Sequence, residues 1–308
     1  DPSGNIVARS ESQTTLPDGE QTIISHAVSV DDPQLWSVDT PSLYQARVSL
    51  IKDGRDVDYV STTFGIRSVE FNTETGFVLN GQVMELRGGC FHHDNGPLGS
   101  AVIDRAEERK IELLKKAGYN AIRCSHNPPS PQLLDACDRL GMLVIDEAFD
   151  MWARPKNPED YSGYFGENWK DDLTSMVLRD RNHPSVIMWS IGNEIPEARE
   201  QAGFEIAAGL TALVRELDTT RAVTEALVDF MGVNRPDYVG WDDVAPHMAL
   251  LDVAGYNYGY NKYEADHEKY PDRIMYASES MPALTLPDWQ MVEKLPYVFG
   301  SFTWTAMD

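Results

Sequence analysis

From residue 71 onward, short apolar segments alternate with longer amphipathic segments, and this alternation constrains the fold more than any other feature of the chain. Three of the longer segments, residues 130–140, 169–181 and 204–217, have the length of a crossover helix between parallel strands. The short segments have the length and the apolar content of buried strands. They cover residues 85–90, 120–124, 143–147, 186–193, 222–226, 252–256, 274–279 and 298–304. Eight strands with helices between them predict an α/β fold, the (β/α)8 TIM barrel.

Capping and turn residues mark two further elements near the start of the barrel. A helix is predicted over residues 104–117, with Asp104 as its N-cap and Gly118 as its stop. Before it, residues 77–84 read as a hairpin that turns at Asn80-Gly81.

The first 70 residues have a different pattern, that of β structure. Residues 44–50 alternate apolar and polar side chains, Asp53-Gly54 supplies a turn, and residues 57–64 form a second β-rich run. This pattern predicts an all-β sandwich over residues 1–70, followed by the barrel over residues 71–308. A sandwich domain normally needs about 100 residues, so we expect an incomplete one. The chain ends just after the eighth predicted strand, without a closing helix, which favours a piece of a longer protein.

The charge of the chain argues against polyanionic partners. Asp and Glu number 49 against 26 Lys and Arg, a formal net charge of −23. Such a surface repels nucleic acids and anionic membranes, so neither is an expected partner. No apolar run approaches the roughly 18 residues of a spanning helix, and the polar opening residues of this chain are not a signal peptide. The sequence therefore predicts a soluble chain, but it does not indicate the compartment or the oligomeric state.

Two predicted strands end in a carboxylic acid. The fourth runs into Gly192-Asn193-Glu194, and the seventh ends at Glu279. In a closed barrel these strands lie on opposite sides of the mouth, so the two acids can face each other across a pocket. Hydrolysis of a glycosidic bond requires such a pair, because one carboxyl group protonates the leaving oxygen while the other attacks or activates water.

Other polar clusters have simpler readings. Ser125 and His126 are adjacent on an extended segment and point to opposite faces, which argues against a nucleophile–base dyad. His92-His93-Asp94 lacks the spacing and the third ligand of a metal site, so no metal is expected. Asp146 and Glu147, at the end of the third predicted strand, either line the pocket or support a neighbouring arginine.

Three stretches together resemble glycoside hydrolase family 2, which includes β-galactosidases, β-glucuronidases and β-mannosidases. They are residues 180–194, residues 120–128 followed by 141–147, and Phe64-Gly65-Ile66-Arg67. The resemblance covers essentially the whole chain, with residues 1–70 similar to the family's immunoglobulin-like domain. It implies a retaining mechanism with Glu194 as acid/base and Glu279 as nucleophile.

The resemblance also implies supporting roles. Asn193 would bind the sugar 2-hydroxyl, and Arg123 would keep Glu279 ionised. Tyr258 would hydrogen-bond the nucleophile, with Tyr256 as the rival for that role. The remaining sugar contacts implied are His126, His93, Asp94 and the stacking floor Trp304. At Asn127 the family commonly has tyrosine, a departure that affects subsite contacts and not the acids.

These expectations define a retaining exo-β-glycosidase with a carbohydrate substrate, and the resemblance favours terminal β-galactosides. A β-glucuronidase or β-mannosidase is the alternative within the family, and a non-catalytic carbohydrate-binding fragment is the alternative of another class. No cofactor is expected from the residues; magnesium occurs in some family members, and only the resemblance suggests it.

Overall fold

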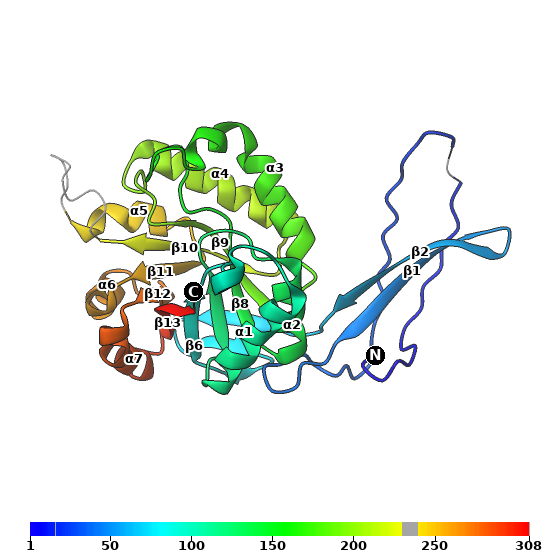
Figure 1. Cartoon of the computed structure of the whole chain (residues 1–308), viewed down its shortest axis with the longest axis horizontal. Helices are drawn as coiled ribbons and strands as arrows, with labels where there is room; N and C mark the ends of the chain where they lie inside the picture. The colour runs from blue at the N-terminus through cyan, green and yellow to red at the C-terminus, as the bar shows by residue number, and fades with distance from the viewer. Residues whose placement is uncertain (16, 230–239, 308) are drawn as a thin grey trace.

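A closed barrel of eight parallel strands forms the body of the computed structural model, which describes residues 1–15, 17–229 and 240–307 (Figure 1). The strands follow one another around the ring in chain order, and the last pairs with the first. They are β6 (Leu86–Phe91), β7 (Ala121–Cys124), β8 (Leu143–Glu147), β9 (Val186–Asn193), β10 (Ala222–Val228), β11 (Val253–Asn257), β12 (Met275–Ser280) and β13 (Val298–Met307). The predicted TIM barrel is confirmed, and the ends of its strands move by at most three residues.

Helices cover the outside of the barrel between successive strands (Figure 1). The α-helices are α1 (Asp104–Lys116), α2 (Pro131–Leu140), α3 (Ser162–Asp180), α4 (Gln201–Leu217), α5 (Ala245–Met248), α6 (Tyr263–Lys269) and α7 (Thr285–Lys294). Short 3-10 turns are η1 (Gly96–Leu98), η2 (Trp241–Val244), η3 (Tyr260–Lys262) and η4 (Pro282–Leu284).

Helices α2 and α4 begin one residue after and three residues before their predicted starts, and the beginnings of α1 and α3 also differ from the prediction. The N-cap of α1 is Ile103, and Asp104 is the first helical residue, where its charge still favours the positive end of the helix dipole. Helix α3 begins at Ser162, seven residues before the predicted start. Its first turns contain two glycines and have low helix propensity, but Phe165 is buried against Trp169 and Phe149. Tertiary packing therefore stabilises a segment that propensity disfavours.

The amino-terminal end of the barrel is closed by a small antiparallel sheet. It consists of β3 (Val69–Asn72), β4 (Gly76–Leu79) and β5 (Gln82–Val83), and β4 and β5 flank the Asn80-Gly81 turn as predicted. Phe77 of β4 is fully buried and packs near Phe299 of β13, with ring centroids 6.3 Å apart. This end of the barrel is a packed core, so a substrate site has to lie at the opposite end.

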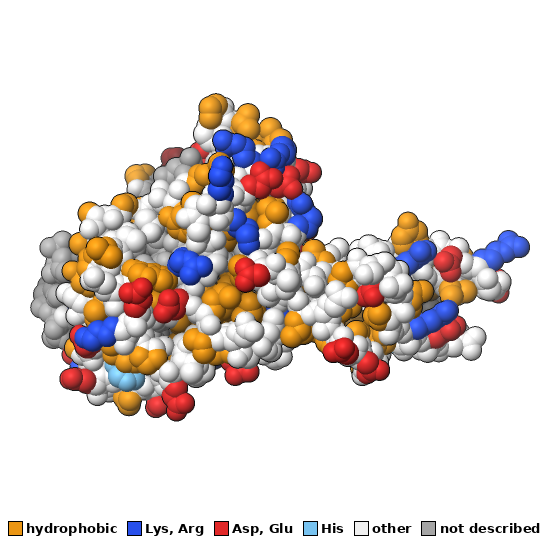
Figure 2. Space-filling model, turned by 90° about the horizontal axis from the view of Figure 1, so that it is seen from below, with side chains coloured by type: hydrophobic (Ala, Val, Ile, Leu, Met, Phe, Trp, Pro, Cys, Tyr) orange, Lys and Arg blue, Asp and Glu red, His pale blue; other side chains and the backbone are white. Residues whose placement is uncertain are grey.

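The N-terminal region contains one two-stranded antiparallel sheet, β1 (Tyr44–Lys52) with β2 (Arg55–Phe64), which projects from the barrel (Figure 1, Figure 2). The sandwich was predicted to be incomplete, and the described residues of this region form a single layer of two strands without a second sheet against it. Val48 and Val60 pair across the strands and are 72% and 64% exposed. The boundary at residue 70 stays a prediction.

Two side chains attach this region to the barrel. Trp36 is fully buried, and its indole N–H donates to the Asp138 carbonyl at 2.9 Å. Arg67, from the predicted joining motif, donates to the carbonyl groups of Pro184 and Val186 at the start of β9. Neither contact reaches the carboxyl ends of the strands. Among the described helices, none has the length and apolarity needed to cross a membrane.

Candidate active site

The carboxyl ends of β7, β8, β9 and β12 meet around the guanidinium group of Arg123. This side chain is fully buried and donates to both sides of the barrel, to Glu147 Oε2 at 2.7 Å and to Glu279 Oε1 at 2.8 Å. It also donates to Asn193 Oδ1 at 2.9 Å. One cation therefore holds side chains from three other strands at the predicted mouth.

In this cluster, ion pairing affects the pKa values of Glu147 and Arg123 more than burial does. Burial by itself would raise the pKa of the Glu147 carboxyl, but the charge of Arg123 and the hydrogen bonds of His126 and Ser190 lower it. For Arg123, burial disfavours the charged form, yet the carboxylates of Glu147 and Glu279 raise its pKa well above the ordinary value. Glu147 is thus ionised and braces Arg123, which was one of its two predicted roles.

Glu279 accepts hydrogen bonds on both oxygens. Arg123 occupies Oε1, and the Tyr258 hydroxyl donates to Oε2 at 2.6 Å. Burial, the charge of Glu279 and this hydrogen bond raise the pKa of Tyr258, which therefore stays a donor. Two donors, one on each carboxyl oxygen, fix the orientation of Glu279. Tyr256, the rival, instead donates to Asp266 at 2.6 Å.

Glu194 follows the last residue of β9 and has a different environment. Its backbone is in the left-handed region, with φ 44°, and its N–H donates to the Ala226 carbonyl at 2.8 Å. Asn257 donates to its Oε1 at 3.0 Å. Burial and, secondarily, the charge of Glu279 raise the pKa of Glu194, against the Asn257 hydrogen bond and the positive charge of Lys156.

The same asparagine connects the two acids. Asn257 is paired in register with Glu279 on the neighbouring strand β12 while its amide binds Glu194. A second bond from this amide reaches Asn193 Oδ1 at 3.1 Å. Glu194 and Glu279 therefore belong to one cluster, and their environments differ: Glu279 is paired with a cation, whereas Glu194 has a neutral amide.

His126 joins the cluster to an aromatic wall. Its Nδ1 lies 2.6 Å from Glu147 Oε1, and its Nε2 lies 3.3 Å from the Asn193 amide nitrogen. This network assigns the proton to Nδ1, which donates to the carboxylate, while Nε2 accepts from the amide. The ring stacks on Trp304, with centroids 5.1 Å apart and an interplanar angle of 6°. His92 contacts the edge of Trp304 at 5.1 Å.

Three predicted residues lie outside this cluster. Asp146 is buried, but neither of its carboxylate oxygens has a partner among the described residues, and burial together with Asp180 raises its pKa well above the ordinary value. Asp146 points to the outer face of β8, opposite to its neighbours Ile145 and Glu147. It therefore neither lines the pocket nor supports Arg123. His93 and Asp94 are exposed and bond to Asn127 and the Gly96 N–H instead.

Sequence reasoning missed Asn257, Asp150 and Lys156. Asn257 ends β11 and could have been found as a polar residue at a strand end. Asp150 and Lys156 lie in the loop between β8 and α3, where no sequence pattern distinguishes them from other charged loop residues. Asp150 accepts from the Asn193 amide at 3.0 Å, and Lys156 donates to Asp150 at 2.6 Å.

A cavity of about 390 Å³ adjoins the cluster. His126 and Asp150 form one side of it, and its other walls come from α3 and the loops after β7 and β8. The lining consists of His126, Asn127, Pro128, Ala148, Phe149, Asp150, Met151, Tyr161, Asp172, Ser175, Met176 and Arg179.

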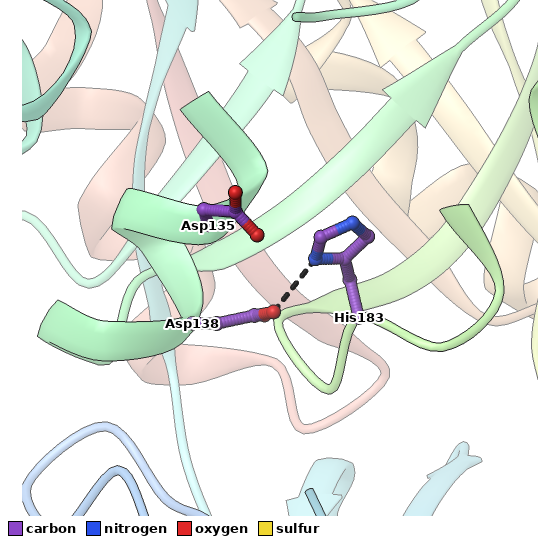
Figure 3. A group of neighbouring side chains, drawn as sticks. All are labelled: Asp135, Asp138 and His183. Atoms are coloured by element: carbon purple, nitrogen blue, oxygen red, sulfur yellow. Dashed lines mark hydrogen bonds and ion pairs between the residues drawn. The ribbon is translucent and has the colours of Figure 1, made fainter. Parts of the chain in front are cut away.

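One group among the described residues could offer three ligand atoms to a cation: Asp135, Asp138 and His183 (Figure 3). Asp138 already accepts from the Ser185 N–H at 3.1 Å and contacts His183 Nδ1 at 2.6 Å. The group lies where α2 meets the start of β9, at the end of the barrel away from the mouth. Its bonds serve the packing of that end, and it takes no part in the cluster around Arg123.

Comparisons with known proteins agree with this fold. The family model described as "Glycosyl hydrolases family 2, TIM barrel domain" matches residues 69–305, and "Glycosyl hydrolases family 2" matches residues 1–67. Beta-galactosidase BoGH2A of Bacteroides ovatus is 39% identical over 306 residues, 92% of this chain and 36% of that protein. A beta-glucuronidase of Bacteroides fragilis is 26% identical over 339 residues, 98% of this chain and 47% of that protein.

Solved structures give the same result. A glycosyl hydrolase family 2 member from Bacteroides cellulosilyticus superposes with a TM-score of 0.93 and 52% identity, covering 99% of this chain and 38% of that one. The chain thus spans between about a third and half of the length of these three relatives. With the barrel matched over most of its length, the chain belongs to glycoside hydrolase family 2.

Proposed function

We propose that this chain carries the catalytic centre of a retaining exo-β-glycosidase, with Glu279 as nucleophile and Glu194 as acid/base. The observation that supports it best is the unequal environment of the two acids. Arg123 and Tyr258 donate to Glu279, as an anionic nucleophile requires. Glu194 lacks a direct cationic partner among the contacts described above, and its raised pKa suits a proton donor.

The reaction then proceeds in two displacements. Glu194 donates its proton to the glycosidic oxygen while a Glu279 oxygen forms a bond to the anomeric carbon, and the leaving group departs as an alcohol. Water next attacks the anomeric carbon, Glu194 takes its proton, and the bond to Glu279 breaks. Asn193 binds the 2-hydroxyl in this proposal, and Trp304 supplies the apolar face for the ring.

A terminal β-galactoside is the proposed substrate. BoGH2A, which matches most of this chain, is named a beta-galactosidase. The B. fragilis relative is named a beta-glucuronidase, so a glucuronide is the competing substrate. The two differ at C4 and in the group at C6, and the residues around those positions decide between them.

Incubation of the full natural protein with chromogenic β-galactoside, β-glucuronide and β-mannoside tests the proposal. We expect release of chromophore from the galactoside, with NMR showing the β-anomer as the first product. Glu279→Gln keeps the shape of the side chain and removes the nucleophile, so kcat should fall by at least about 10³-fold. Sugar binding without turnover by the wild-type protein would instead support a non-catalytic carbohydrate-binding role.

The role of Glu194 has its own test. Glu194→Ala should slow the first step strongly for substrates with poor leaving groups and little for those with very good ones, because only the former need protonation. In the wild-type protein, activity should fall on the alkaline side at a pH above the ordinary glutamate range, since the raised pKa keeps the acid protonated. Equal loss with both kinds of leaving group would contradict the acid role.

A further inference from the structure

Lys156 bonds directly to the backbone of Asn193 and, through Asp150, to its side chain. Its ammonium group donates to the backbone carbonyl of Asn193 at 2.7 Å and to Asp150 Oδ1 at 2.6 Å. The same Asp150 oxygen accepts from the side-chain amide of Asn193 at 3.0 Å. Lysine, aspartate and asparagine therefore form a closed ring of hydrogen bonds, with only 13% of the lysine side chain exposed.

This ring fixes the orientation of the Asn193 amide. The amide oxygen accepts from Arg123 and Asn257, and the amide nitrogen donates to Asp150 and His126. A flipped amide would place its NH2 group against the N–H donors of Arg123 and Asn257, and its oxygen against a carboxylate. Asp150 can act as an acceptor because the charge of Lys156 outweighs burial and lowers the pKa of Asp150.

The loop that carries Lys156 is held in place. The carboxylate of Asp160 accepts from the backbone N–H groups of Lys156 and Asn157 at 2.7 and 2.9 Å. The lysine thus reaches Asn193 from an ordered turn, and side-chain entropy opposes the contact less than it would from a free loop.

Lys156 also acts on the residue after Asn193. The charged and titratable groups around Glu194 are Glu279 on β12, His126 after β7, Tyr258 after β11 and Lys156 from the β8–α3 loop. The positive charge of Lys156 opposes the effect of Glu279 on the pKa of Glu194.

We propose that Lys156, acting through Asp150, is a positioning residue of this active site: it fixes the Asn193 amide for the 2-hydroxyl of the sugar. This role rests on the proposed function. Its effect should depend on which hydroxyl groups the substrate carries. A defect in amide orientation affects only substrates that carry a 2-hydroxyl group.

The test compares Lys156→Met, Lys156→Arg and Asp150→Asn with wild type on a chromogenic β-galactoside and its 2-deoxy analogue. The matched control is Lys269→Met, a lysine of α6 that is 50% exposed and paired with Asp242. Lys156→Met should lower kcat/KM roughly 10- to 100-fold on the galactoside, the size expected for a charged hydrogen bond, and less than about threefold on the 2-deoxy analogue. Lys156→Arg should recover part of the loss, and Lys269→Met should match wild type.

The pH dependence of activity gives a second test, because the two substitutions should shift the alkaline limb in opposite directions. Without the lysine cation the pKa of Glu194 rises, so the alkaline limb of Lys156→Met should move to higher pH. Without the aspartate anion the lysine charge acts on Glu194 unopposed, so the limb of Asp150→Asn should move to lower pH. A purely structural role predicts equal losses on both substrates and no opposite shifts, and that result would overturn the proposal.

Crystal structures of Lys156→Met and Lys156→Arg provide a test that needs no turnover. The Asn193 amide should lose its contact with Asp150 in the methionine variant and keep it in the arginine variant. An unchanged Asn193 in Lys156→Met would contradict the positioning role even if the wild-type protein cleaved none of the sugars. Absence of wild-type turnover with a displaced amide would count against the proposed function alone.

Discussion

The β1–β2 hairpin and the barrel strands are built from similar apolar residues but lie in opposite environments. Val48 of β1 is 72% exposed, whereas Ile145 of β8 is fully buried. Both are β-branched residues in strands that are paired with a neighbouring strand. The difference is the second layer: α-helices cover the barrel strands on one side and the closed interior covers the other, but no layer of the described residues covers the hairpin.

The ion pairs of the hairpin and of the barrel also differ in how far they are exposed to water. Arg47 and Asp56 pair across the hairpin at 3.6 Å with both side chains 55% exposed. Arg123 and Glu279 pair at 2.8 Å with the arginine fully buried. Water screens the Arg47–Asp56 pair but not the Arg123–Glu279 pair. The same kind of ion pair is therefore weak on the hairpin and strong at the mouth of the barrel.

The largest expected effect comes from breaking the buried pair. Arg123→Met leaves the carboxylates of Glu147 and Glu279 without their cation, and we expect a loss of about 3–5 kcal/mol in the free energy of unfolding together with loss of activity. Arg47→Met is the matched change on the hairpin and should leave the unfolding transition where it is. Urea denaturation of both variants measures the contrast. Equal shifts would show that burial does not separate the two pairs.

A smaller effect is expected from apolar truncation. Ile145→Ala opens a cavity in the barrel and should lower the free energy of unfolding by about 2–5 kcal/mol. Val48→Ala removes methyl groups that are already in water, so its thermal midpoint should stay close to that of wild type. If Val48→Ala proved as costly as Ile145→Ala, the hairpin would have to be covered in solution, and the comparison drawn above would fail.

The smallest effect is expected from a single buried acid near the mouth. Asp288 of α7 accepts from Ser301 at 2.5 Å, and burial raises its pKa to about 6 from 3.8. The folded state therefore binds more protons than the unfolded state between these values. The free energy of unfolding should fall as pH rises from about 4 to about 6.

Asp288→Asn cannot titrate, so the stability of this variant should depend less on pH over that window than the stability of wild type. Chemical denaturation at intervals of half a pH unit measures the difference. Identical pH dependence in the two proteins would mean that Asp288 is ionised when folded.

Most of the barrel could be predicted because its signals are local. Each buried strand is a short apolar run between helical segments, and β9 has the predicted bounds. The catalytic candidates Glu194 and Glu279 follow from the same rule, since parallel strands of a barrel all end at one face. Arg123, Asn193 and Tyr258 came from the family resemblance, and their contacts around the two acids fit the roles it implies.

The structure decided what depends on neighbours distant in sequence. Asp146 and Glu147 are adjacent and chemically alike, but the alternation of the strand turns one outward and the other to Arg123. Asp150 and Lys156 enter the cluster through the path of a loop, which no periodic pattern encodes.

The sequence by itself determined the order of the strands and placed Glu194 and Glu279 at one end of the barrel. Only the tertiary structure decided which charges pair, which tyrosine reaches Glu279 and whether the first strands are buried. The physical reason is that secondary structure follows from the period of apolar residues along the chain, whereas burial and pairing depend on the layer that another part of the chain supplies.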